Sequence, residues 1–377
     1  MEYRELIHNG DRVSLLGFGF MRLPIKENDP SKIDDKTAFE MVDYAISKGI
    51  NYFDTAYMYH DGMSELFVSR ALKKYPRDSY FLADKLPLWS LKSIDDVQSI
   101  FDEQLRKCGV EYFDYYLMHA MAKGRFEKAV KLGIYDKLKE YQRQGRIRNL
   151  GFSFHDTPEV LETMLTTYDW DFVQLQINYL DWELQNARKQ YELVEAKGIK
   201  CIVMEPVRGG ALADLCPEAN DILKQFSPER SIASWAVRYA ASLPNVLTVL
   251  SGMSDFSQVK DNIGSMNPFS PLSDKEKTVL QNALDTYKKT QTLPCTSCRY
   301  CMDCDFGVDI PRVFEILNSY SLTKDSYAAA SAVKGLAGEK HPSNCTECGS
   351  CAIRCPQSIE IPAQMKRASN IFKELSQ

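Results

Sequence analysis

The sequence lacks the features that would carry a protein into or across a membrane. Its 377 residues contain no uninterrupted apolar run of the roughly 20 residues that span a bilayer. Its first 20 residues lack the positively charged start and apolar core of a secretion signal. We therefore expect a soluble, cytoplasmic protein without a membrane partner.

An excess of basic residues is also missing. Lys and Arg number 46 against 51 Asp and Glu, which gives a formal net charge of −5. Because a nucleic-acid partner is bound through a positive patch or stripe, we expect no nucleic-acid partner. The 44% of hydrophobic and 26% of charged residues are typical of a globular chain. Its length suits either two or three domains or one barrel with a small domain.

Short apolar runs alternate with amphipathic helical patterns up to about residue 265. The runs that predict strands are Ser14–Gly19, Ile50–Asp54, Tyr80–Lys85, Phe113–His119, Arg148–Ser153, Phe172–Ile177, Lys200–Met204 and Leu247–Ser251. The helical patterns include Asp35–Lys48 and Trp182–Lys197. Eight such units favour an α/β fold of the TIM (β/α)8 barrel type over an open doubly wound sheet. The G-x-G-x-x-G turn of a Rossmann domain does not follow the first strand.

A Pro- and Ser-rich stretch, residues 267–274, indicates a joint between two modules. We expect the barrel over residues 1–270 and a small α-rich module over residues 271–377. A capped helical pattern, Lys275–Lys289, opens the second module. The small residues of Ser326–Gly338 predict a further helix.

Eight of the eleven cysteines form two short runs in this second module. Of the scattered ones, Cys201 is expected to lie in the core of a strand, and Cys108 and Cys216 are expected to be inert. The first run consists of Cys295, Cys298, Cys301 and Cys304, and the second of Cys345, Cys348, Cys351 and Cys355. The second run is followed by Pro356 and has the C-x2-C-x2-C-x3-C-P spacing of 4Fe–4S ferredoxins. In a reducing compartment, such clustered cysteines are metal ligands more often than disulfides.

In the ferredoxin spacing the fourth cysteine of each run binds the other cluster. We therefore expect two 4Fe–4S clusters in a ferredoxin-like domain. One is held by Cys295, Cys298, Cys301 and Cys355, and the other by Cys304, Cys345, Cys348 and Cys351. Zinc is the alternative, because paired C-x2-C units also form zinc ribbons, but three evenly spaced cysteines favour iron–sulfur. In the first run only two residues precede Cys304, and Asp305 replaces the proline.

Ionisable residues stand at the ends of the predicted strands. Asp54 closes the second strand and is followed by Tyr59, while Lys85 and His119 close the third and fourth. The carboxyl ends of barrel strands meet at one mouth, where catalysis is found. There a lysine favours tyrosine phenolate, a carboxylate positions the lysine, and a histidine can hydrogen-bond a carbonyl. Taken singly, His119 would be interpreted as a core histidine, Asp54 as a helix cap and Lys85 as an ion-pair residue.

These segments resemble the aldo-keto reductase superfamily from about residue 12 to residue 265. The matching motifs are residues 49–59, Ser64-Glu65, residues 83–85, residues 114–119 and residues 151–153. The cysteine module is similar to that of the superfamily branch with a C-terminal 4Fe–4S dicluster domain. The resemblance implies a catalytic tetrad of Asp54, Tyr59, Lys85 and His119. In it Tyr59 is the general acid that protonates a carbonyl oxygen.

The resemblance also implies NADP or NAD at the barrel mouth. The positions that match its cofactor-binding segments are Met21, Arg22, Asp54, Ser153, Gln174, Met204, Glu205, Pro206, Val207, Ser251, Gly252, Met253, Gln258, Asp261 and Asn262. Ser153 and Gln174 match the pair that binds the nicotinamide carboxamide, and Arg22 is the expected pyrophosphate contact. Gly252 and Gln258 stand where many members have Lys and Arg for the 2′-phosphate, which argues against a strong NADPH preference.

The sequence thus predicts an NAD(P)H-dependent oxidoreductase that reduces a small aldehyde or ketone, or oxidises an alcohol. Two alternatives stay open. In one, the chain transfers single electrons from its clusters to a redox protein partner. In the other, the barrel senses the nicotinamide redox state, and the clusters are structural or oxygen-sensing. The substrate itself is not indicated by any motif.

Overall fold

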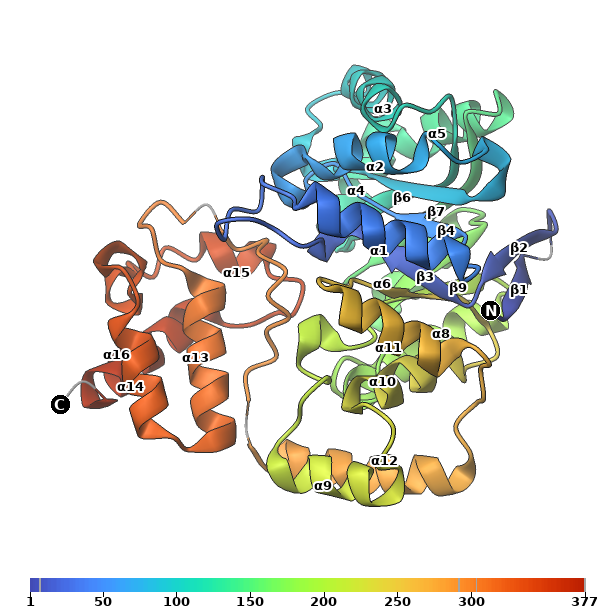
Figure 1. The fold of residues 1–377 in the computed structure, drawn as a ribbon. Helices are drawn as coiled ribbons and strands as arrows, with labels where there is room; N and C mark the ends of the chain where they lie inside the picture. Colours follow the sequence, from blue (N-terminus) through green and yellow to red (C-terminus); the bar gives the residue numbers. More distant parts are fainter. Residues whose placement is uncertain (7, 291, 303, 376–377) are drawn as a thin grey trace. The chain divides into compact units, whose positions relative to one another are not determined.

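The computed structural model describes residues 1–6, 8–290, 292–302 and 304–375. The chain divides into two compact units (Figure 1). The first unit comprises Met1–Val207 and Ala233–Leu272, and the second comprises Arg208–Ile232 and Ser273–Gln377. The second unit therefore includes a segment that lies between two barrel strands in the sequence.

The first unit is a closed barrel of parallel strands. Its strands are β3 (Leu16–Gly19), β4 (Tyr52–Asp54), β5 (Phe81–Leu86), β6 (Phe113–Met121), β7 (Ile147–Phe154), β8 (Phe172–Gln176), β9 (Lys200–Met204) and β10 (Val246–Ser251). They follow one another in chain order, and β10 pairs with β3 to close the barrel. The predicted (β/α)8 barrel is confirmed. Ser14, however, ends β2 instead of opening the first barrel strand.

Helices surround the barrel strands (Figure 1). They are α1 (Asp35–Ser47), α2 (Ser64–Leu72), α3 (Asp95–Cys108), α4 (Lys123–Leu132), α5 (Ile134–Arg143), α6 (Pro158–Thr167), α7 (Asp181–Leu184), α8 (Ala187–Ala196), α10 (Ile232–Ala241) and α11 (Phe256–Met266). The single helix expected over Trp182–Lys197 was wrong, because Asn186 takes a left-handed conformation with φ 53° between α7 and α8. The described residues of this unit also form short 3-10 helices, η1 (Phe20–Arg22), η2 (Tyr59–Gly62), η3 (Arg77–Ser79) and η4 (Leu88–Ser90).

An antiparallel hairpin of β1 (Tyr3–Leu6) and β2 (Asp11–Ser14) closes the end of the barrel where the strands begin. Leu6 and Val13 of the hairpin pack with inward-facing side chains such as Tyr115 and Phe172. This burial of apolar area stabilises the barrel interior. It leaves the opposite mouth, at the carboxyl ends of the strands, for a functional site.

The second unit is built from helices. They are α9 (Pro217–Phe226), α12 (Asp274–Tyr287), α13 (Ile310–Thr323), α14 (Ser326–Lys334), α15 (Ser350–Arg354) and α16 (Ile361–Leu375), with the 3-10 helices η5 (Arg208–Gly210), η6 (Lys288–Thr290), η7 (Gly338–Lys340) and η8 (Pro342–Asn344). As expected, α12 begins with a cap, in which Ser273 and Glu276 bond each other's backbone. Val313, Phe314 and Met365 are central to a separate apolar core that packs against the cysteines.

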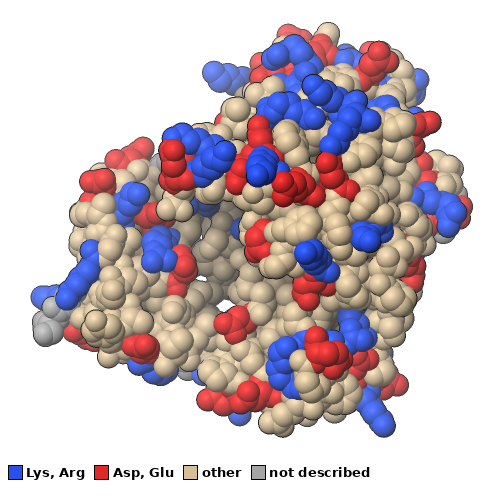
Figure 2. Space-filling model, in the orientation of Figure 1, with Lys and Arg blue, Asp and Glu red and all other residues tan. Residues whose placement is uncertain are grey.

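Charged side chains are mixed on the face of the molecule that Figure 2 shows, with Lys and Arg interspersed among Asp and Glu. Within the part of the chain that the structure describes, no helix has both the length and the apolarity to cross a bilayer.

Candidate functional site

Four ionisable side chains meet at the carboxyl ends of the barrel strands. The Nζ atom of Lys85 donates hydrogen bonds to Asp54 Oδ1 at 2.5 Å and to the Thr55 carbonyl oxygen at 2.7 Å. The same Nζ lies 4.9 Å from the centre of the Tyr59 ring. The rings of Tyr59 and His119 are edge to face, with their centres 6.1 Å apart. The structure therefore brings the four residues of the expected tetrad together.

Burial controls the charge states of this group. It raises the pKa of Asp54, although the neighbouring Lys85 cation opposes the rise. Burial, followed by the charge of Lys85, lowers the pKa of His119 well below its usual range. His119 is therefore neutral at neutral pH and can donate one N–H to a carbonyl oxygen.

The rim beside His119 is aromatic and positively charged. The ring of Trp89 is 41% exposed, and its centre lies 5.1 Å from that of His119. Burial lowers the pKa of His155 to about 4, and the charge of Arg125 adds to this shift. The Trp89 ring therefore packs against a tetrad residue at the barrel mouth.

The expected carboxamide pair lies on neighbouring strands. Ser153 of β7 and Gln174 of β8 are in register, so they stand at the same height in the barrel. Ser153 Oγ accepts a hydrogen bond from the Ala120 N–H at 2.7 Å. Gln174 is buried, and its Oε1 has no hydrogen-bond partner among the described residues. Because a buried acceptor without a donor is costly, this atom fits the N–H2 group of a bound carboxamide.

The other expected cofactor residues lie around the same strand ends. Met21 and Arg22 lie in η1, which follows β3. Met204 ends β9 and is followed by Glu205, Pro206 and Val207, and Ser251 ends β10 and is followed by Gly252 and Met253. Gln258, Asp261 and Asn262 lie in α11. Arg22, the expected pyrophosphate contact, is paired with Glu205 Oε1 at 2.9 Å. Asn262 Nδ2 donates to Ser251 Oγ at 2.8 Å. Asp255 caps α11 by accepting from two backbone N–H groups.

Sequence reasoning missed the buried network that holds Lys85. Asp84 Oδ1 accepts the Lys85 N–H at 2.8 Å, and Gln104 Nε2 donates to the Lys85 carbonyl at 3.0 Å. Gln104 Nε2 also donates to Glu65 Oε1 at 3.1 Å. Glu65 follows Ser64 in a quoted motif, so the signal was present, but nothing marked it as a neighbour of Lys85.

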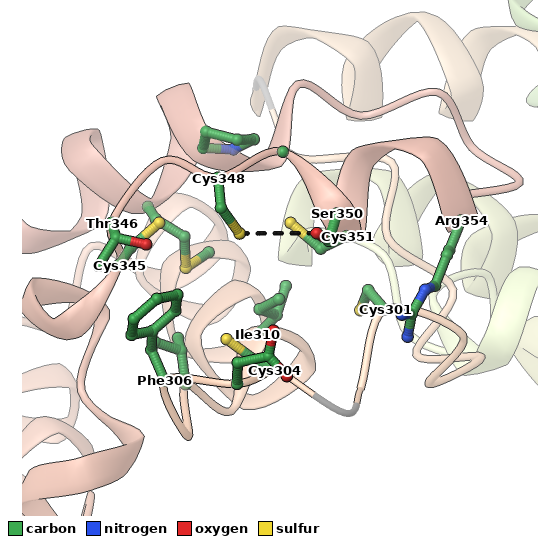
Figure 3. A pocket seen from close by; sticks show the side chains of 15 residues that line it. Cys301, Cys304, Phe306, Ile310, Cys345, Thr346, Cys348, Ser350, Cys351 and Arg354 are labelled. Atoms are coloured by element: carbon green, nitrogen blue, oxygen red, sulfur yellow. Dashed lines mark hydrogen bonds between the residues drawn. The ribbon is translucent and has the colours of Figure 1, made fainter.

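The cysteines of the second unit surround two cavities. In Figure 3 the sulfur atoms of Cys304, Cys345, Cys348 and Cys351 lie around one cavity, which Cys301, Phe306 and Met365 also line. The other cavity is lined by Cys295, Cys298, Cys301 and Cys355, with Phe314 and Ile359. Cys304 therefore lies with the second run and Cys355 with the first, which is the crossed arrangement that the spacing predicts.

The chemistry of both cavities fits an iron–sulfur cluster. The thiols of each group surround a space that apolar side chains also line, as the ligands of a four-iron cluster must. The Ser297 N–H donates to Cys295 Sγ at 3.4 Å, and such N–H···S bonds tune cluster potentials.

The three scattered cysteines lie apart from these cavities. Cys108, Cys201 and Cys216 are all buried. Burial raises the pKa of the Cys108 thiol well above its usual range and also raises the pKa of Cys201. A buried, protonated thiol is a poor nucleophile, so neither Cys108 nor Cys201 has the environment of a reactive cysteine.

Comparison with known proteins gives the family context for this geometry. The model of the aldo/keto reductase family matches residues 15–285, and that of the 4Fe-4S dicluster domain matches residues 294–360. A probable aldo-keto reductase from Glycine max is 30% identical over 49% of this chain. The match spans only about half (52%) of the length of that relative. L-galactose dehydrogenase from Arabidopsis thaliana is 25% identical, covering 74% of this chain and 92% of its own length.

Two further matches cover most of their own chains. NADH-specific methylglyoxal reductase from Escherichia coli is 26% identical over 64% of this chain and 85% of its own. The holo form of an aldo-keto reductase from Bacillus halodurans superposes with a TM-score of 0.62 and 27% identity, over 75% of this chain and 96% of its own. The chain belongs to the aldo/keto reductase family and carries a 4Fe-4S dicluster domain after its barrel.

Proposed function

We propose that this chain transfers hydride between a nicotinamide cofactor and a small carbonyl or alcohol substrate. The observation that carries the proposal is the buried Lys85–Asp54 pair beside the Tyr59 ring, with neutral His119 across from it. A buried charge pair is costly to desolvate. Because the Lys85–Asp54 pair lies against the Tyr59 ring at the barrel mouth, its charge can act on the Tyr59 hydroxyl.

The four side chains have complementary roles in carbonyl reduction. Tyr59 donates its hydroxyl proton to the carbonyl oxygen, a step that typically contributes about 10²–10⁴-fold. Lys85 stabilises the phenolate that remains, and Asp54 compensates the Lys85 charge in this buried place. His119 donates a hydrogen bond to the same carbonyl oxygen and orients it. The bound nicotinamide supplies the hydride to the carbonyl carbon.

The residues at the expected cofactor positions favour NADH over NADPH. Ser153 and the open acceptor Gln174 Oε1 hold the nicotinamide carboxamide. Toward the adenosine end, Gly252 and Gln258 provide no cation for a 2′-phosphate. The Asp255 carboxylate already caps the first turn of α11, where it repels a further anion. The E. coli relative is named for NADH, which agrees with this reading.

The names of two relatives suggest the first substrates to test. One is named for methylglyoxal reduction and the other for L-galactose oxidation. Both involve a small aldehyde or its reduced form, which the Tyr59–His119 arrangement can accommodate in either direction. Because thiolate-bound clusters need reducing surroundings, we also propose a cytoplasmic location.

We assign two 4Fe–4S clusters to the two cysteine cavities. A second function, single-electron exchange with a protein partner, is favoured by the surface around them. Cys348 is exposed, and Ile353 of α15, two residues before Cys355, is 86% exposed. Hydride transfer moves two electrons together, so this exchange is proposed as separate from the barrel reaction.

An isotope experiment tests the barrel function. Anaerobically purified, cluster-replete protein is given NADH that carries deuterium at both C4 positions together with methylglyoxal, and the product is examined by mass spectrometry. We expect one deuterium at the former carbonyl carbon. Unlabelled product, or no oxidation of NADH or NADPH with any small aldehyde, would overturn the proposal. Cluster absorbance and EPR after addition of NADH alone test whether the clusters act separately from the barrel. We expect dithionite, and not NADH, to bleach the cluster absorbance.

A further inference from the structure

His60, the residue after Tyr59, makes two hydrogen bonds that join separate parts of the barrel mouth. Its Nε2 accepts the Leu23 N–H at 3.1 Å, and its Nδ1 lies 2.9 Å from the Pro30 carbonyl oxygen. Because Nε2 accepts, Nδ1 carries the proton and donates it to Pro30. Only 9% of His60 is exposed. Both ring nitrogens of a largely buried, neutral histidine are therefore engaged with backbone far away in the sequence.

The backbone at His60 is one that side chains seldom adopt. His60 has φ 54° and ψ 43°, and Asp61 has φ 53° and ψ 38°, so two consecutive non-glycine residues are left-handed. Each such residue costs about 1–2 kcal/mol. A turn of this kind persists only where surrounding contacts hold it. The His60 ring bonds supply such contacts directly beside Tyr59.

The segment bound by His60 is the one expected to face the cofactor. Leu23 directly follows η1, which contains Met21 and Arg22. Pro30 lies in the loop after it, which is closed by the Ile25–Ile33 bridge. His60 thus fixes the turn that carries the proposed proton donor relative to the segment that carries the expected pyrophosphate contact.

From this geometry we propose that His60 is a positioning residue, which holds Tyr59 in place relative to the segment from Phe20 to Pro30. The role of Tyr59 in this proposal rests on the proposed reductase function. Because a misplacement of about 1 Å can cost about 10²-fold in rate, loss of this link should act on turnover more than on binding.

Three substitutions separate the two hydrogen bonds. His60→Leu removes both, His60→Gln keeps an acceptor near the Nε2 position, and His60→Asn keeps a donor near the Nδ1 position. His8→Leu is the matched control, because it also removes a histidine hydrogen bond, that between His8 Nε2 and Asn149 Oδ1 at 3.0 Å, but in the turn between β1 and β2. Each variant is made in the full-length, cluster-replete chain and checked for unchanged iron content and circular dichroism.

Hydrogen exchange gives a readout that does not depend on turnover. We expect His60→Leu to speed amide exchange about tenfold in both residues 20–34 and residues 57–63, because loss of each bond loosens both ends. His60→Gln should protect the Leu23 amide better than His60→Asn does. Exchange that stays at the wild-type rate in either segment, or changes equally in His8→Leu, would overturn the proposal.

Kinetics with methylglyoxal and NADH give the second readout. We expect His60→Leu to lower kcat roughly 10–100-fold and to change the NADH dissociation constant less than about threefold. In a Tyr59→Phe background the same change should lower the residual rate by less than about threefold, since the group that it positions is gone. Full additivity of the two substitutions contradicts the proposal. A wild type without turnover overturns the reductase function instead, and exchange then decides whether His60 links the two segments.

Discussion

Lys85 Nζ lies 2.5 Å from Asp54 Oδ1, and both side chains are buried at the mouth of the barrel. Burial raises the pKa of Asp54 while the lysine opposes the rise, so each charge is kept in this place by the other. Removing one partner of such a pair leaves an uncompensated charge, which costs about 3–5 kcal/mol.

The first prediction concerns this pair. Asp54→Leu should lower the free energy of unfolding by about 3 kcal/mol or more, because Lys85 is left buried and unneutralised. The double variant Asp54→Leu with Lys85→Met should recover most of that stability and none of the activity. Urea unfolding with activity assays checks both. A double variant as unstable as Asp54→Leu alone would show that packing, not charge, causes the loss.

The second prediction follows from the lowered pKa of His155. The pKa of His155 is lowered to about 4, whereas an unfolded histidine titrates near 6.5. As pH falls below 6.5 the unfolded chain therefore binds the proton first, and stability is lost until about pH 4. Between pH 7 and pH 5 the loss from His155 should be about 2 kcal/mol.

His155→Gln tests the sign and the source of this effect. Its unfolding free energy should fall about 2 kcal/mol less than that of the wild type over the same pH range, measured at equal cluster content. If the unfolding free energy of His155→Gln changes with pH as steeply as that of the wild type, His155 is not the source of the effect.

The third prediction concerns Gly209 in the second unit. A Cβ atom at Gly209 would overlap the backbone carbonyl of Thr296, the residue after Cys295, and the φ of Gly209 is 65°. Gly209→Ala should therefore displace the first cysteine run and lower cluster content. Gly210→Ala is the matched control, since its φ of 100° carries strain but its Cβ meets nothing within 4 Å. Iron per chain distinguishes them, and equal iron in both contradicts the steric argument.

The fourth prediction tests the crossed ligands. If Cys304 and Cys348 bind the same cluster, the double variant Cys304→Ala with Cys348→Ala should lose about half of the iron. Combining Cys304→Ala with Cys298→Ala should lose nearly all of it, because two clusters are then each missing a ligand. The reverse result would mean that each run binds its own cluster.

Much of this architecture could be predicted from the sequence. Alternating apolar runs identified all eight barrel strands, because buried parallel strands are apolar along their length. The ferredoxin spacing predicted that Cys304 lies with the second run and Cys355 with the first, and their binding of clusters stays a prediction. The helix split at Asn186 was missed, since one left-handed residue leaves an amphipathic pattern intact.

Long-range relations were outside the reach of pattern reasoning. The contact of Gly209 with Thr296 joins segments separated by 87 positions, and a Gly-Gly pair alone does not show what it approaches. The Arg22–Glu205 pair is of the same kind, because it joins the ends of β3 and β9. The His60 bonds to Leu23 and Pro30 are a third case, because no sequence pattern links a loop histidine to residues 37 and 30 positions away. The domain division at residue 270 and the role of each site residue stay proposals.

The central claim, that Tyr59 donates the proton, is tested most directly by Tyr59→Phe in cluster-replete protein. The measurement is kcat with methylglyoxal and NADH, beside the NADH dissociation constant from fluorescence quenching. Tyr57→Phe is the matched control, because the Tyr57 hydroxyl is bonded to Glu103 at 3.0 Å. Our account predicts that Tyr59→Phe loses about 10²-fold or more in kcat with nearly unchanged NADH binding, and that Tyr57→Phe keeps most activity. Unchanged turnover in Tyr59→Phe would contradict it.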